Sequence, residues 1–81
     1  MANYFKEFMG KRVRVVSKFV TADSYVCYEG IFEGINNIYM FLRDGKIIRV
    51  SGIKPKEIVA VEDFKKIMIN KGIVSFVKVI E

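Results

Sequence analysis

The chain has 81 residues, of which 52% are hydrophobic and 28% charged, with one proline and a formal net charge of +5. This composition is that of one small folded domain, and it excludes a disordered segment and a multi-domain enzyme. The basic excess favours an anionic partner such as nucleic acid.

The residue types present narrow the chemistry further. There is no histidine, and Cys27 is the single cysteine, so one chain cannot build a zinc site of nitrogen and sulfur ligands or a histidine-dependent catalytic group. We therefore expect no catalytic residue, no metal and no cofactor. Cys27 lies in an apolar run and is expected to be a small buried side chain. No apolar run is long enough for a membrane span, which predicts a soluble cytoplasmic protein without membrane contact.

The first ten residues predict a short helix. Tyr4, Phe5 and Phe8 recur at spacings of three and four, Asn3 is a suitable cap, and Gly10 is a suitable end.

Five strands are predicted next. Valine and arginine alternate in the first strand, and the second is rich in aromatic and branched residues. Gly30 and Gly34 within the second strand predict a bend or a close backbone approach. Asp44 and Gly45 predict a hairpin turn. The predicted strands are residues 11–20, 25–35, 38–43, 46–50 and 56–62.

The last twenty residues differ from this pattern. Phe64, Ile67 and Met68 lie on one face of a predicted helix that ends at Gly72, and residues 73–80 predict a further strand that is apolar on both faces. The sequence thus predicts an all-β fold, a small, strongly bent, five-stranded antiparallel barrel with an N-terminal helix and an additional C-terminal helix and strand. We divide it into a barrel domain, residues 1–62, and an extension, residues 63–81.

Two stretches resemble the Sm-like (Lsm) family. The first is YEGIFEGINNIYM, whose spacing of aromatic, glycine, apolar and amide residues matches the family's first motif through Tyr28, Gly30, Phe32, Asn36 and Tyr39. The second is IKPKEIVAV, residues 53–61, which has the length and apolar spacing of the family's Ile-Arg-Gly segment. With the predicted N-terminal helix, the resemblance covers residues 3–62.

The resemblance implies a non-catalytic protein that forms a homo-oligomeric ring, usually a hexamer or heptamer, and binds RNA. The fourth strand of one subunit would pair with the fifth strand of the next, here residues 46–52 with residues 57–61. It also implies an RNA site. The residues expected to bind RNA are Asn36, Asn37, Ile38, Met40, Lys54 and Lys56.

This site departs from the family where the base is recognised. Met40 stands where the family has a base-binding asparagine, Ile38 occupies the stacking position, and Lys54 followed by Pro55 replaces Arg-Gly. Methionine and isoleucine cannot hydrogen-bond a base edge, and lysine stacks less well than arginine. We therefore expect phosphate contacts to dominate and base selectivity to be weak.

Two alternatives remain open. One is an Sm-like ring with a structural or assembly role that has lost RNA binding, which Met40 and Ile38 favour. The other is a monomeric SH3-like module that binds nucleic acid or protein.

Overall fold

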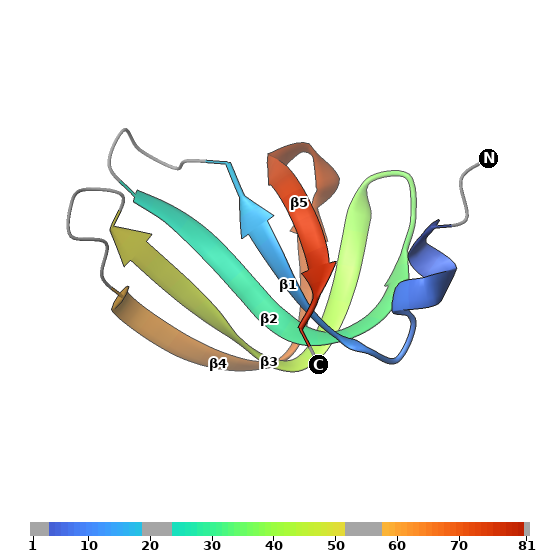
Figure 1. The fold of residues 1–81 in the computed structure, drawn as a ribbon, viewed down its shortest axis with the longest axis horizontal. Helices are drawn as coiled ribbons and strands as arrows, with labels where there is room; N and C mark the ends of the chain where they lie inside the picture. Colours follow the sequence, from blue (N-terminus) through green and yellow to red (C-terminus); the bar gives the residue numbers. More distant parts are fainter. Residues whose placement is uncertain (1–3, 19–23, 52–57, 81) are drawn as a thin grey trace.

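One antiparallel sheet forms the molecule, which we describe from a computed structural model covering residues 4–18, 24–51 and 58–80 (Figure 1). The predicted all-β class is confirmed. The sheet has five strands in the order β4-β3-β2-β1-β5, and the long ribbons of β2, β3 and β4 curve strongly. The strands are β1 (Arg12–Ser17), β2 (Ser24–Ile35), β3 (Tyr39–Ser51), β4 (Ile58–Asn70) and β5 (Val74–Val79).

The sheet is bent but is not a closed barrel. β4 pairs with β3 and β5 pairs with β1, and among the described residues β4 and β5 do not pair with each other. Both strands therefore leave one row of backbone donors and acceptors at an edge of the sheet. The predicted closure of the barrel within one chain is not observed.

The N-terminal segment forms a 3-10 helix, η1 (Tyr4–Phe8), where the sequence predicts a short helix from Asn3 to Gly10. Gly10 follows it with a φ of 76°, a conformation that suits glycine. The ring of Phe8 meets the ring of Phe32 edge to face, with centroids 5.9 Å apart. The segment therefore covers one end of the core.

The predicted Asp44-Gly45 hairpin is wrong, because these residues lie within β3. Glu29 is paired with Lys46 and Ile31 with Arg43, so Asp44 and Gly45 together face the single residue Gly30. This is a β-bulge, and Asp44 has the positive φ, 51°, that such a position needs. An Asp-Gly pair favours positive φ in a hairpin and in a bulge alike, so the local signal does not distinguish them.

The predicted helix after residue 62 is also wrong. Residues 58–70 form the single strand β4, and the proposed boundary between residues 62 and 63 falls inside it. Ile67 pairs with Leu42, and Ile69 pairs with Met40. β4 therefore lies along the edge of β3 that faces away from β2 and supplies core side chains there. The segments expected to pair between subunits are residues 46–52 and 57–61, and their described parts pair with each other within the chain, as Ile48 does with Val61.

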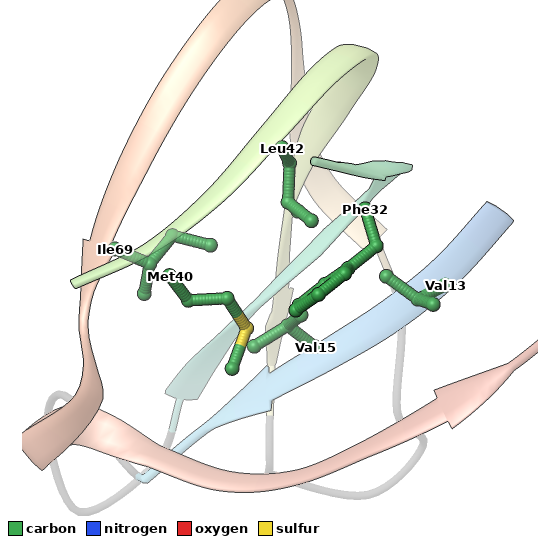
Figure 2. Packing of buried hydrophobic residues seen from close by; sticks show 6 residues of the cluster. All are labelled: Val13, Val15, Phe32, Met40, Leu42 and Ile69. Atoms are coloured by element: carbon green, nitrogen blue, oxygen red, sulfur yellow. The ribbon is translucent and has the colours of Figure 1, made fainter. Parts of the chain in front are cut away.

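The core lies where the sheet curves most. Figure 2 shows the Phe32 ring among the five other side chains of the cluster, and all six are almost completely removed from solvent. β1 contributes two valines because its residues alternate between the two faces of the sheet, as the sequence predicts. The cluster is Val13, Val15, Phe32, Met40, Leu42 and Ile69.

The interior polar and titratable groups are accommodated in different ways. The buried Ser17 hydroxyl donates to the carbonyl of Val26 (2.7 Å) and accepts from its N–H (3.1 Å), so the hydroxyl is hydrogen-bonded although it is buried.

Cys27 is free and buried, as predicted. Burial raises the pKa of the Cys27 thiol, with Arg14 opposing and Glu29 adding to the shift, and burial also raises the pKa of Tyr28.

Two glycines of the sheet, Gly45 at the bulge and Gly34 in β2, differ in the space available to a side chain. A Cβ on Gly45 would overlap the backbone of Glu29, whereas a Cβ on Gly34 would meet nothing within 4 Å. We expect Gly45→Ala to lower the free energy of unfolding by about 3 kcal/mol, because backbone cannot move aside as a side chain can. Gly34→Ala is the matched control and should raise it by about 0.5 kcal/mol, since alanine loses less conformational entropy in a strand.

Urea unfolding followed by circular dichroism measures both variants. Equal stabilities for the two variants would show that the β2 and β3 backbones do not approach each other in this way.

Candidate nucleic-acid interface

The turn between β2 and β3 is organised by one side chain. Oδ1 of Asn36 accepts hydrogen bonds from the N–H groups of Ile38 (2.8 Å) and Tyr39 (2.7 Å). The N–H of Asn36 donates to the carbonyl of Tyr39 (2.8 Å) and completes the turn. This is the local pairing for which asparagine is favoured in turns. It leaves the side chains of Asn37 and Ile38 on the surface, and Ile38 is 57% exposed.

The turn between β4 and β5 is built in a similar way. Oδ1 of Asn70 accepts from the N–H of Gly72 (2.7 Å) and caps the short 3-10 helix η2 (Lys71–Ile73). Asn70 is the register partner of Tyr39, the first residue of β3. The second turn therefore lies next to the first, although some 35 residues separate them in sequence.

Lys71 joins the two turns. Its N–H donates to the carbonyl of Ile38 (2.8 Å), and its side-chain Nζ donates to the carbonyl of Asn36 (3.0 Å). An ammonium group has three donors, so this one contact leaves Nζ able to bind a further acceptor. The residue is exposed, and its charge lies beside the exposed amide and apolar side chains of the first turn. The arrangement suits an anionic ligand with a flat apolar part.

The structure brings together three of the predicted site residues, namely Asn36, Asn37 and Ile38. Met40 is a correction, because it is only 2% exposed and its side chain belongs to the core. Met40 and Leu42 are two positions apart on β3, so both side chains point to the core face of the sheet. Lys54 and Lys56 lie outside the described residues.

Lys71 is the candidate site residue that the sequence does not predict. The signal was present as Asn-Lys-Gly at residues 70–72, which was interpreted as the end of a helix. The same three residues make a capped turn between two strands equally well, because asparagine caps and glycine turns occur in both settings.

A shallow cavity of about 370 Å³ adjoins the two turns. Its walls are mostly apolar, and Lys71 lies at its rim. What remains exposed of Met40 faces this space, where it offers an apolar contact but no hydrogen bond. The lining residues are Phe8, Ile35, Met40, Lys71 and 74–77.

Further chemistry is limited in the part of the chain that the structure describes. No group of three or more acidic, cysteine or histidine side chains there is placed to hold a metal ion. No described helix is long and apolar enough to cross a membrane. The interface therefore consists of a cation, amide groups and apolar surface.

Comparison with known proteins gives no match, whether with protein-family models, with curated proteins or with solved structures.

Asn36 provides a direct test of the first turn. We expect Asn36→Ala to lower the free energy of unfolding by about 1 kcal/mol, because the N–H groups of Ile38 and Tyr39 lose their shared acceptor. Asn37→Ala is the matched control, since Asn37 is exposed beside it and its side chain makes no such bond among the described residues. Chemical denaturation measures both variants, and equal losses of stability would contradict the role of Asn36.

Proposed function

We propose that this protein is a non-catalytic, ring-forming, Sm-like protein that binds RNA or another single-stranded nucleic acid mainly through its phosphates. The observation that carries the proposal is the contact between the two turns through Lys71, which sets an exposed cation beside Asn36 and Ile38. Asn36 and Ile38 are the positions at which the resemblance to the Sm-like family implies an RNA site. A cytoplasmic location remains part of this proposal.

The second half of the site is assigned to Lys71 in place of Lys54 and Lys56. Lys71 and Gly72 supply a cation followed by glycine, as in the family's Ile-Arg-Gly segment, and they lie against the first turn. A lysine binds phosphate as a point charge and does not form the paired hydrogen bonds of an arginine. Lys71 therefore favours contacts that do not depend on base sequence.

Weak base selectivity follows from the side chains around Lys71. Met40 is buried, and Ile38 provides apolar surface without a donor or acceptor. A base packed against Ile38 would gain contact area, whichever base it is. Affinity then depends on counterion release from the phosphates, and a ring would multiply the number of such contacts.

The two edge strands support assembly into a ring. Ile58, Val61 and Met68 on β4 are exposed, as are Phe76 and Val79 on β5. A row of backbone groups together with exposed apolar side chains favours pairing with another chain. Because β4 and β5 are different surfaces, their pairing is head to tail, and such an interface forms a cyclic homo-oligomer when the rotation between subunits closes.

A second candidate is a structural ring without RNA binding. The buried position of Met40 favours it, because no side chain remains there to hydrogen-bond a base. The two candidates differ in nucleic-acid affinity but agree in native mass, whereas a monomeric SH3-like module differs in native mass.

The RNA test is the salt dependence of binding, measured by fluorescence anisotropy with labelled oligouridine and oligoadenine. We expect similar affinities for the two oligonucleotides. Lys71→Gln should weaken both equally and lower the magnitude of the log–log salt slope by about one for each subunit that contacts phosphate. Lys65→Gln is the matched control, since Lys65 is an exposed lysine on β4 several residues from the turn.

An equal effect of the two lysine variants would contradict the assigned site. Absence of binding by the unmodified protein at low salt would favour the structural ring.

The assembly test uses the edge of β5. The N–H of Ile80 donates to the carbonyl of Arg12, so the preceding N–H, that of Val79, points away from β1. Proline at such an outward position is tolerated by the sheet but cannot donate to a neighbouring subunit. We expect Val79→Pro to lower the mass measured by light scattering, while Val79→Ala, which keeps the N–H, retains it. A monomeric mass for the unmodified chain would contradict the ring.

A further inference from the structure

A second surface lies on the face of the sheet opposite the core. Val13 and Val15 point into the core, so the residues between and after them, Arg14 and Val16, point to the other face. Val16 pairs with Phe76 on one side and with Cys27 on the other, and Cys27 pairs with Ile48. Directly opposed residues share a face of the sheet. These four side chains thus form one apolar row across four strands.

A second row lies parallel to it, towards the far end of the strands. Tyr25 pairs with Val50, and Val50 pairs with Ile58 on β4. Together the two rows make an apolar floor that spans all five strands, roughly 19 Å at the usual strand spacing. We call the space above this floor the β-face groove.

The β-face groove is a real concavity of about 690 Å³, to which all five strands contribute. This volume lies within the range of small-molecule sites, about 300–1,000 Å³. Cys27 is buried at its floor, whereas Phe76 and Ile58, on the two edge strands, are 52% and 63% exposed. The described residues leave this apolar surface open to solvent.

One end of the groove is charged. Lys78, Arg14 and Glu29 form the next cross-strand row beside the apolar one. The guanidinium of Arg14 holds the Glu29 carboxylate through Nε (2.8 Å) and Nη2 (2.7 Å), so these two charges cancel. Lys78 makes no ion pair among the described residues, so its charge is available to a ligand. Lys18 adds a second cation to the groove lining.

We propose that the β-face groove binds a single-chain amphiphile with one carboxylate, such as a medium-chain fatty acid, with the carboxylate at Lys78 and the chain along the apolar floor. Lys78 makes no ion pair among the described residues and lies directly beside the first apolar row, so it is complementary to one negative charge on an apolar body. A polyanion fits less well, because the apolar floor offers its further charges no partner. The groove shares Phe76 with the cavity beside the two turns but does not include Lys71.

Isothermal titration calorimetry with laurate, below its micelle concentration, tests the proposal on the unmodified protein. We expect saturable binding, and weaker binding of dodecanol, which has the same chain without the charge. Lys78→Glu should weaken laurate binding by about tenfold or more, because the charge beside the carboxylate is reversed. The matched control Lys65→Glu makes the same change of charge on β4 outside the groove and should leave laurate binding within about twofold.

Two further variants test the floor, one on each edge strand. Phe76→Ser and Ile58→Ser each replace an exposed apolar side chain of the groove, and each should weaken the binding of laurate and of dodecanol equally. Lys78→Glu should instead weaken the binding of laurate more than that of dodecanol. Circular dichroism identifies a variant that fails to fold, and the other then carries the test. Equal affinities for laurate and dodecanol, or equal effects of Lys78→Glu and Lys65→Glu, would overturn the proposal.

Other occupants of the groove have distinct signatures. Binding to vesicles containing phosphatidylglycerol without binding of free laurate would identify a membrane surface and overturn the proposal. An oligomer that Phe76→Ser dissociates, with no heat from laurate, would show that Phe76 serves the contact between subunits and would also overturn the proposal. Saturable laurate binding sensitive to Lys78 supports the proposal whether or not RNA binds.

Discussion

The close approach of Gly30 and Gly45 is the constraint on which the rest of the structure depends. Side chains at these positions would separate β2 from β3, because a Cβ on Gly30 would come within 2.9 Å of the Arg43 carbonyl oxygen. With the glycines in contact, the bulge at Asp44 bends both long strands at the same level. On the turn side of the bend lie Phe32 and the core, and on the other side lie the strands that carry the β-face groove.

The bend also determines where the two turns meet. β4 follows β3 along its whole length, so the end of β4 reaches the turn between β2 and β3 and places Lys71 against Asn36. The exposed cation is thus positioned by backbone pairing over many residues rather than by its own side-chain contacts. This explains how a site with few polar contacts acquires a defined geometry.

The sequence predicts those features that depend on local alternation and local turn chemistry. Val13 and Val15 are buried as their alternation with arginine indicates, and Asn36 makes the turn that its position suggests. It does not predict β4, because the spacing of Phe64 and Ile67 is compatible with a helical face as well as with a strand. The decision between them depends on the partner strand β3, far away in the sequence. Lys71 was missed for the same reason, since its neighbour in space is known only once the strands are paired.

β5 explains why the end of the chain is apolar on nearly every side. Val74 and Val77 pack against the core, while Phe76, on the other face, forms one wall of the β-face groove. The strand begins beside the turn of Lys71, and its outer edge carries the N–H of Val79. A strand that packs on both faces and leaves its outer edge open for pairing has little use for polar side chains, so its hydrophobicity reflects these several surfaces rather than an excess of core. On this view Lys78 is the exception that requires an explanation, and its place beside the apolar row of the groove provides one.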